Sequence, residues 1–221
     1  MGELMSNVQK KAVIFDLDGT LLNTLEDIAI SANNALNALG FEPQELDKYR
    51  YFVGEGIVKL FENIFASNPQ KPEIIAKAVE HFERHYLTVN TKPYEGIAQM
   101  LSFLQDKGIK IAILSNKPDA LTKLCALQYF KEWNFEVVYG AREGVAKKPD
   151  PAGVLEVVEL LKLDPKECYY MGDTWIDMQT AKRANITSLG ALWGFRDEKE
   201  LTENGASHLL KHPLDIVKFF S

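Results

Sequence analysis

The sequence Ala12-Val13-Ile14-Phe15-Asp16-Leu17-Asp18-Gly19-Thr20 places two carboxylates directly after an apolar run. The run predicts a short buried strand, and side chains two residues apart leave the same face of a strand. We therefore expect Asp16 and Asp18 to emerge together at its end. Such a pair can act as nucleophile and general acid, because a metal ion beside Asp16 keeps it ionised while Asp18 exchanges a proton with a reacting oxygen. The alternative is a strand that ends in a polar turn, since Asp and Gly are common turn residues.

Three further polar segments follow along the chain. The apolar run Lys110 to Leu114 leads into Ser115-Asn116-Lys117, and Cys168 to Met171 leads into Gly172-Asp173-Thr174-Trp175-Ile176-Asp177. The third segment, Lys147-Lys148-Pro149-Asp150-Pro151, lies between them. Together with the first stretch they resemble the haloacid dehalogenase superfamily, whose motifs are Asp-x-Asp-Gly-Thr, Ser or Thr, Lys-Pro-x-Pro and Gly-Asp-x-x-x-Asp. All four motifs are present, in order and intact.

The pattern of apolar residues predicts an α/β fold with a doubly wound parallel sheet. Predicted strands alternate with predicted helices, which is typical of a parallel sheet covered on both faces. In such sheets ligands bind beyond the carboxyl ends of the strands, and all four motifs lie at or near those ends. The predicted strands are 12–15, 110–114, 136–139, 168–171 and 188–192, and the predicted helices are 97–107, 119–128, 151–161, 176–184 and a terminal amphipathic helix over 213–220.

The alternation fails between Leu25 and Asn90, where only helical patterns occur, and helices are predicted over 25–39, 57–66 and 73–89. The simplest interpretation is a helical domain, residues 23–92, inserted into a core domain made of residues 1–22 and 93–221. The resemblance implies the same arrangement, in which a helical cap closes over the active site and opens to exchange ligands. A closing cap excludes water and selects substrates by shape.

The resemblance also implies a mechanism. Asp16 attacks phosphorus and becomes an aspartyl phosphate, which water hydrolyses, while Asp18 first protonates the leaving oxygen and then deprotonates the water. Mg²⁺ fits an oxygen site made of Asp16, the backbone carbonyl of Asp18 and Asp173. Asp177 binds the metal directly or through water, or instead favours the positive end of a helix that begins at Ile176.

Phosphoryl transfer concentrates negative charge on oxygen, so the remaining site residues must donate hydrogen bonds or positive charge. Ser115 supplies a hydroxyl, Asn116 a backbone amide, and Lys148 a charge that neutralises the phosphate and Asp16. Lys147 is a second candidate for that cation, but Lys148 directly precedes Pro149 as the family motif requires. The loop after the first strand completes the expected phosphate site: Asp16, Leu17, Asp18, Gly19 for a tight turn, and Thr20, which offers a hydroxyl or begins a helix.

Asp18 argues against the dehalogenases and the phosphonate hydrolases of the superfamily, which leaves a phosphatase or a phosphomutase like β-phosphoglucomutase. Three segments resemble the phosphoglycolate phosphatases, which implies 2-phosphoglycolate as substrate: Val53-Gly54-Glu55-Gly56, Pro93-Tyr94-Glu95-Gly96 and Trp193-Gly194-Phe195. A catalytically silent binding protein on the same fold is a further alternative. The intact charged motifs argue against it.

Substrate-specificity residues are expected in the cap. Gly54 and Gly56 allow a backbone loop, with Glu55 between them, to reach the substrate, and Arg50 or Lys59 can meet a carboxylate. The alternative is a turn between helices that carries exposed charges.

Composition supports a globular enzyme. The chain has 221 residues, 46% of them hydrophobic, and a net charge of −6, which argues against a nucleic-acid-binding protein. Two cysteines, Cys125 and Cys168, predict buried free thiols. The sequence has no apolar stretch near 20 residues and no hydrophobic leader, so we expect a cytoplasmic protein that does not bind membranes. Its expected ligand is a small phosphorylated metabolite. We expect a monomer or a homodimer. Residues 1–10 are expected to form a loosely held tail.

Overall fold

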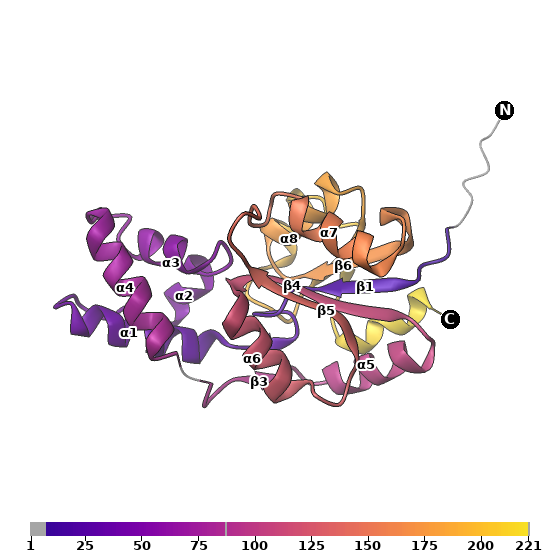
Figure 1. Ribbon diagram of the computed structural model, residues 1–221, viewed down its shortest axis with the longest axis horizontal. Helices are drawn as coiled ribbons and strands as arrows, with labels where there is room; N and C mark the ends of the chain where they lie inside the picture. The colour runs from indigo at the N-terminus through magenta and orange to yellow at the C-terminus, as the bar shows by residue number, and fades with distance from the viewer. Residues whose placement is uncertain (1–7, 87, 221) are drawn as a thin grey trace.

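A six-stranded parallel sheet forms the centre of the computed structural model, which describes residues 8–86 and 88–220. The order of its strands is β5-β4-β1-β6-β7-β8, with helices on both faces (Figure 1). This confirms the predicted α/β fold. The strands are β1 Ala12–Phe15, β4 Lys110–Pro118, β5 Phe135–Ala141, β6 Cys168–Gly172, β7 Thr187–Ala191 and β8 His208–Leu210. Most of the predicted tail, residues 1–7, lies outside the described residues.

The central strand β1 is buried on both faces, which explains its continuous apolar run. Val13 and Phe15 belong to a hydrophobic core on one face of the sheet, and Ala12 and Ile14 belong to a second core on the other face. On the first face lie α5 Ile97–Asp106, α6 Asp119–Tyr129 and the 3₁₀ helix η2 Pro213–Phe219, and on the second lie α7 Ala152–Leu161 and α8 Trp175–Arg183. The parallel strands therefore end together at one edge of a sheet that is covered on both sides.

Some elements differ from the sequence predictions. β4 continues through the polar segment after Leu114 as far as Pro118. The C-terminal segment is a 3₁₀ helix, with Ile216 buried in the first core. The short elements β8, α9 Glu198–Glu203 and η1 Pro165–Glu167 were not predicted, because each is too short to show an apolar period. Among the described residues no helix has the length and apolar character needed to span a bilayer.

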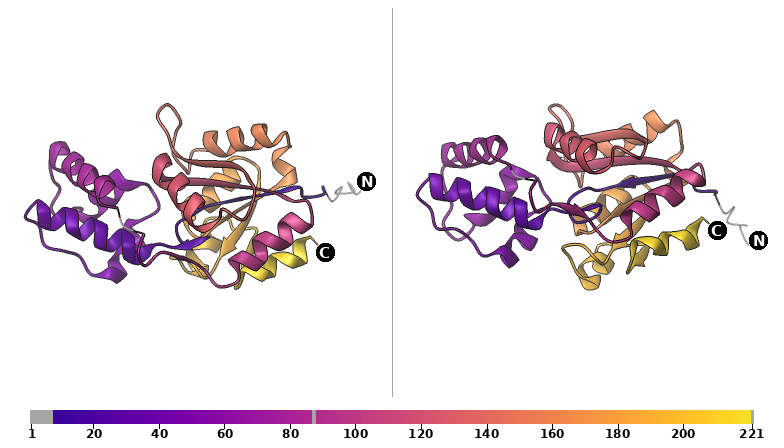
Figure 2. Two further views of the ribbon diagram at one scale, coloured as in Figure 1. Left: turned by 60° about the horizontal axis from the view of Figure 1, so that its bottom comes forward. Right: turned by 90° about the horizontal axis from the view of Figure 1, so that it is seen from below.

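Four helices between β1 and β4 form a separate unit, the helical insertion: α1 Leu25–Ala38, α2 Leu46–Phe52, α3 Ile57–Ile64 and α4 Pro72–Arg84. They pack around their own hydrophobic cluster. The insertion lies beyond the carboxyl end of β1, and the C-terminal segment lies at the opposite end of the molecule (Figures 1 and 2). Helix α2 was not predicted, and α4 ends at Arg84, five residues before the predicted end at Val89.

The two connections to the insertion run side by side as a short antiparallel ladder, β2 Leu22–Asn23 with β3 Lys92–Pro93. Beside this ladder the buried carboxylate of Asp27 accepts hydrogen bonds from the backbone amides of Asn90 and Thr91, at 2.7 to 3.1 Å, and from the hydroxyl of Thr91 at 2.6 Å. Asp27 at the start of α1 thus fastens the returning strand to the outgoing one.

One residue of the core domain belongs to the core of the insertion. Phe195 lies in the loop after β7, is only 6% exposed, and is part of the same hydrophobic cluster as Ile57 and Leu60 of α3. The next residue, Arg196, is also buried and donates a hydrogen bond to the carbonyl of Val53 in the insertion, at 3.3 Å. The loop after β7 therefore joins the two parts of the molecule.

Candidate active site

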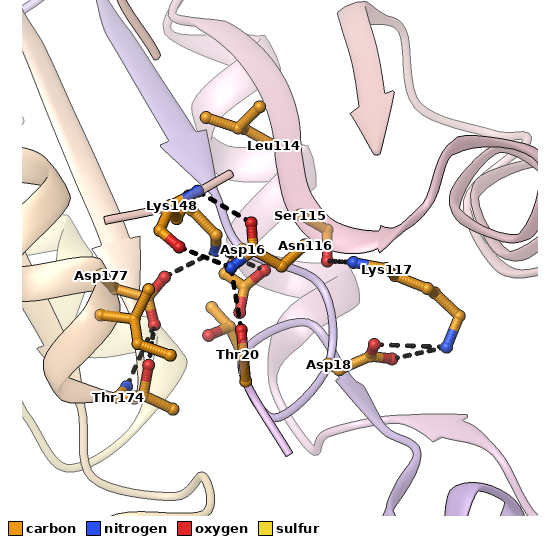
Figure 3. A network of polar contacts seen from close by, with 12 residues as sticks. Asp16, Asp18, Thr20, Leu114, Ser115, Asn116, Lys117, Lys148, Thr174 and Asp177 are labelled. Atoms are coloured by element: carbon orange, nitrogen blue, oxygen red, sulfur yellow. Dashed lines mark hydrogen bonds and ion pairs between the residues drawn. The ribbon is translucent and has the colours of Figure 1, made fainter. Parts of the chain in front are cut away.

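Asp16 lies at the centre of the polar groups that gather at the carboxyl end of the sheet (Figure 3). Its backbone amide still donates to the carbonyl of Met171, so Asp16 is held in line with the sheet although β1 ends at Phe15. Lys148 Nζ lies 2.9 Å from Asp16 Oδ1 and donates a hydrogen bond to Asp177 Oδ1 at 2.7 Å. Both partners come from distant parts of the chain, so the sheet topology creates this contact.

Asp173, which follows β6, is buried and held by two hydrogen bonds and by close contact with two glycines. The hydroxyl of Thr20 donates to its Oδ1 at 2.9 Å, and the backbone amide of Phe195 donates to its Oδ2 at 2.8 Å. Gly19, at φ +88°, and Gly194 press so closely against the Asp173 carboxylate that a Cβ at either position would collide with it. Of the two roles that the sequence allowed for Thr20, the structure therefore shows the first: its hydroxyl orients Asp173. Thr20 does not begin a helix.

Asp177, in the first turn of α8, has two functions. Its Oδ2 accepts hydrogen bonds from the backbone amide and the hydroxyl of Thr174, at 3.1 and 2.8 Å, which caps the helix. Its Oδ1 faces the other acidic side chains: Asp16, Asp173 and Asp177 each place one carboxylate oxygen within 4.8 Å of the others, and all three residues are buried.

The charges of this acidic cluster are not balanced by the described residues that contact it. Of the three buried carboxylates, those of Asp16 and Asp177 pair with one ammonium, that of Lys148. Burial raises the pKa of Asp16 to about 7 against the opposing effect of Lys148, and burial and the charge of Asp177 raise the pKa of Asp173 well above its usual range. Within residues 8–86 and 88–220, Asp16 Oδ1 accepts no hydrogen bond, since Lys148 approaches it outside hydrogen-bond geometry. An excess of buried carboxylate oxygens with a free lone pair suits a divalent cation that prefers oxygen ligands.

Lys148 is the buried residue of the lysine pair, and Lys147 is exposed. Burial alone lowers the pKa of Lys148, but the charges of Asp16 and Asp177 outweigh it and hold that pKa well above its usual value. The Lys148–Pro149 peptide bond is cis. The ammonium that faces Asp16 is thus that of Lys148.

Asp18 points away from the acidic cluster, although it lies only two residues from Asp16 (Figure 3). The next residue, Gly19, adopts a left-handed conformation. The carboxylate of Asp18 accepts hydrogen bonds from Lys117 Nζ, at 3.1 Å to Oδ1 and 3.2 Å to Oδ2. Lys117 is buried, and it also donates to the hydroxyl of Tyr86 at 2.7 Å. The two carboxylates expected to emerge together therefore contact different lysines.

Ser115 and Asn116 occupy buried positions on β4. The side chain of Asn116 accepts from the backbone amide of Lys148 at 2.9 Å and donates to the carbonyls of Lys148, at 2.9 Å, and Gly54, at 3.0 Å. The sequence assigned a backbone role to Asn116, but its side chain connects the Lys148 loop to the helical insertion. Ser115 Oγ accepts from the backbone amide of Lys117 at 3.2 Å.

These side chains border a cavity of about 60 Å³ between the sheet and the helical insertion. Asp16, Asp18, Ser115, Asn116 and Lys117 line it from the sheet. The insertion contributes an apolar wall together with the two glycines of its loop: Ile28, Val53, Gly54, Gly56, Ile57, Leu60 and Phe82. The lining therefore combines two carboxylates, those of Asp16 and Asp18, with the ammonium of Lys117, and the ammonium of Lys148 contacts Asp16 next to it.

Only some of the residues expected to set specificity line this cavity. Gly54 and Gly56 do, but Arg50, Glu55 and Lys59 do not. Arg50 extends across the surface to the carbonyl of Gly194 at 3.4 Å, and Lys59 pairs with Glu62 on an exposed face of α3. Sequence reasoning missed Lys117, which follows Ser115 by two residues and is the insertion-facing cation of the cavity.

Comparisons with known proteins identify the family of the chain. Residues 13–191 match the family model described as haloacid dehalogenase-like hydrolase. The chain is 34% identical over 211 residues to a phosphoglycolate phosphatase of Aquifex aeolicus, covering 94% of this chain and 95% of that protein, and 30% identical over 207 residues to one of Xylella fastidiosa, covering 90% and 88%. A solved hydrolase from Pseudomonas syringae is similar at a TM-score of 0.78 and 26% identity, covering 95% of this chain and 97% of that one. A haloacid dehalogenase-like protein from Streptococcus pneumoniae, 22% identical, shares the fold at a TM-score of 0.85 over 96% of this chain and 99% of its own.

Proposed function

The chain belongs to the family of haloacid dehalogenase-like hydrolases, and on that basis we propose that it is a magnesium-dependent phosphatase of a small phosphorylated metabolite. The observation that carries the proposal is Asp16: a buried carboxylate with one oxygen that accepts no hydrogen bond from the described residues, next to the ammonium of Lys148 and on the lining of the cavity. A nucleophile that must approach a dianionic phosphate needs this neighbouring positive charge.

The proposed reaction has two steps. An oxygen of Asp16 bonds to phosphorus while the ester bond breaks, and Asp18 gives its proton to the leaving alcohol oxygen. A water molecule then attacks the phosphorus of the aspartyl phosphate, Asp18 takes its proton, and inorganic phosphate leaves as Asp16 is regenerated. Lys148 and Ser115 stabilise the charge that builds on the phosphate oxygens in both steps. Both Asp16 and Asp18 line the same cavity, which supports this division of roles.

Magnesium is the cation we propose for the acidic cluster. Asp16 and Asp173 would hold it together with the backbone carbonyl of Asp18, and Asp177 directly or through water. Bound Mg²⁺ supplies positive charge that balances the buried carboxylates and the phosphate oxygens. The excess of three carboxylates over the one ammonium of Lys148 supports this assignment.

We propose that residues 23–92 act as a cap and that 2-phosphoglycolate is the substrate. The paired connections at β2 and β3 provide a hinge, and closing excludes water from the charged site. A cavity of about 60 Å³ supports a substrate with few atoms beyond its phosphate. The phosphoglycolate phosphatases among the relatives, at 34% identity for the one from Aquifex aeolicus, support the same substrate.

Phosphate release from a panel of esters tests the proposal. The panel contains 2-phosphoglycolate, glycerol phosphate, sugar phosphates and pyrophosphate, each with Mg²⁺ and with EDTA. The variants are Asp16→Asn and, as a matched control, Asp106→Asn at the exposed end of α5. We expect Mg²⁺-dependent release that is fastest with 2-phosphoglycolate, lost in Asp16→Asn and kept in the control.

The outcomes separate the parts of the proposal. Release that is fastest with another ester contradicts the assignment of 2-phosphoglycolate as substrate but agrees with phosphatase activity. Release that persists in EDTA contradicts the metal requirement. No release from any ester contradicts the phosphatase itself, and activation by a sugar bisphosphate in that case would identify a phosphomutase.

A further inference from the structure

Lys117 is a buried cation for which the proposed reaction gives no task. Its side chain is 4% exposed, although an ammonium is costly to bury unless it is paired. An ammonium has three N–H groups. Here it donates to both oxygens of Asp18, at 3.1 and 3.2 Å, and to the hydroxyl of Tyr86 at 2.7 Å. Burial lowers the pKa of Lys117, but the contacts with Asp18 and Tyr86 more than reverse this, so the residue stays charged.

The two partners of Lys117 belong to different parts of the molecule. Asp18 lies in the loop after β1, whereas Tyr86 belongs to the helical insertion, two residues beyond the end of α4. The Lys117 ammonium also lies 4.2 Å from the centre of the Tyr86 ring. That ring is 5.3 Å from the ring of Phe82 in the core of the insertion, so Tyr86 must move with the insertion.

We propose that Lys117 is a positioning residue, which holds the Asp18 carboxylate in place for proton transfer while Tyr86 of the closed cap holds Lys117. The proposal rests on the proposed function, because it assigns Lys117 to the acid–base part of that reaction. When the insertion moves away, Lys117 loses a hydrogen bond and a ring contact, and its ammonium meets water. Proton transfer by Asp18 is then confined to the closed, water-excluding state.

The contact with Asp18 distinguishes this role from substrate binding. An ammonium that anchored a second anionic group of the substrate would need a free N–H directed into the cavity. Three acceptor atoms on Asp18 and Tyr86 surround Lys117 Nζ within hydrogen-bond distance, as many as the ammonium has N–H groups. Lys117 therefore acts on the reaction through Asp18.

The first experiment compares Lys117→Met with the wild type, both assayed with Mg²⁺, on two substrates. These are 2-phosphoglycolate and glycerol phosphate, and the second has no carboxylate. We expect kcat to fall roughly 100-fold on both, the scale of one misplaced acid–base group, with KM changed less than about threefold. Lys123→Met, which removes an exposed lysine of α6, is the matched control and should keep the wild-type kcat. A rise in KM for 2-phosphoglycolate alone, with kcat unchanged, would overturn the proposal in favour of an anion-binding site.

The second experiment repeats Lys117→Met in an Asp18→Asn background. The readout is single-turnover formation of the phosphoenzyme from 4-nitrophenyl phosphate, whose leaving group departs without a proton. If Lys117 acts through Asp18, the substitution lowers this rate by less than about threefold, since the group it positions is already absent. A loss close to the roughly 100-fold fall in kcat expected of Lys117→Met alone indicates a general structural role and refutes the proposal.

Tyr86→Phe keeps Lys117 and the aromatic ring and removes only the hydroxyl. This variant therefore tests the positioning role if Lys117→Met does not fold. We expect kcat to fall about 5- to 10-fold on both esters, the effect of one lost hydrogen bond, and an unchanged kcat refutes the role of Tyr86. The proposed function fails separately: it fails if the wild-type protein releases no phosphate, whereas the positioning role fails only when the wild type is active and these variants do not respond as described.

Discussion

Replacing Asp16 by Asn should make the metal-free protein more stable while it abolishes activity. The substitution keeps the size of the side chain and removes one charge from a cluster of three buried carboxylates, two of which pair with the ammonium of Lys148. Functional sites commonly hold such unfavourable charges at the expense of stability. The size of the effect can be derived from the pKa of Asp16.

Burial raises the pKa of Asp16 in the folded protein to about 7, from an ordinary value of 3.8. The interval is roughly three pH units, and about 1.4 kcal/mol per unit gives ~4 kcal/mol. Because the folded-state pKa lies above the unfolded one, the stabilising contribution of the protonated group is fully present below pH 4 and is lost as the pH rises through about 7. An asparagine side chain does not titrate, so the free energy of unfolding of the Asp16→Asn variant should exceed that of the wild type by about 2 to 4 kcal/mol at pH 8. The lower value allows for the lost contact with Lys148. At pH 5 the difference should be less than half as large.

Thermal unfolding in EDTA at pH 8 and pH 5 measures this difference. For a chain of this length about 2 to 4 kcal/mol corresponds to a rise in Tm of roughly 5 to 15 °C. Asp106→Asn, at an exposed position, is the control and should leave Tm unchanged at both pH values. An Asp16→Asn protein that unfolds at or below the wild-type temperature at pH 8 would refute the argument that the charges of the cluster oppose folding without metal.

Three further predictions concern the metal, the cation and the hinge. Mg²⁺ at about 100 times its Kd should stabilise the protein by about 2.7 kcal/mol against unfolding, and Asp173→Asn should lose this effect; an equal Mg²⁺ shift in the variant would show that the metal binds elsewhere. Lys148→Met should lower kcat for phosphate release by roughly 100- to 1000-fold, and a loss below tenfold would mean that its charge does not act on the transition state. Asp27→Ala should cost about 2 to 4 kcal/mol of stability in thermal unfolding, because it leaves the donors of Asn90 and Thr91 without their acceptor; a cost under 1 kcal/mol would show that the ladder holds without it.

The central part of the fold could be predicted because buried parallel strands appear as continuous apolar runs. The run 12–15 and the polar residues after it gave β1 and the edge at which the candidate site lies. β8 and α2 were missed because three and seven residues show no clear period. The end of α4 was placed five residues late, since the apolar pattern continues into Val89 although the helix stops at Arg84.

The candidate site was predicted in its composition but not in its pairing. Family motifs name Asp16 and select Lys148 over Lys147, and in the structure Lys148 is buried beside Asp16 whereas Lys147 is exposed. The partners of Asp18 could not be predicted, because Lys117 and Tyr86 reach it only through the packing of the insertion on the sheet. The spacing of apolar residues predicts which side chains share a face of one helix or strand, whereas these contacts join side chains from different elements.

The place of Phe195 in the core of the insertion has a consequence for how the protein is made. The ribosome releases residues 23–92 long before residue 195, so the nascent helices lack one buried aromatic side chain of the cluster that they form. Burial of such a ring contributes about 1.5 to 3 kcal/mol, a large share of what a unit of this size can gain. The insertion therefore reaches its final stability only after Phe195 has been translated and has left the ribosome. For the same reason, a chimera that exchanges the insertion between relatives must also exchange the loop that carries Phe195.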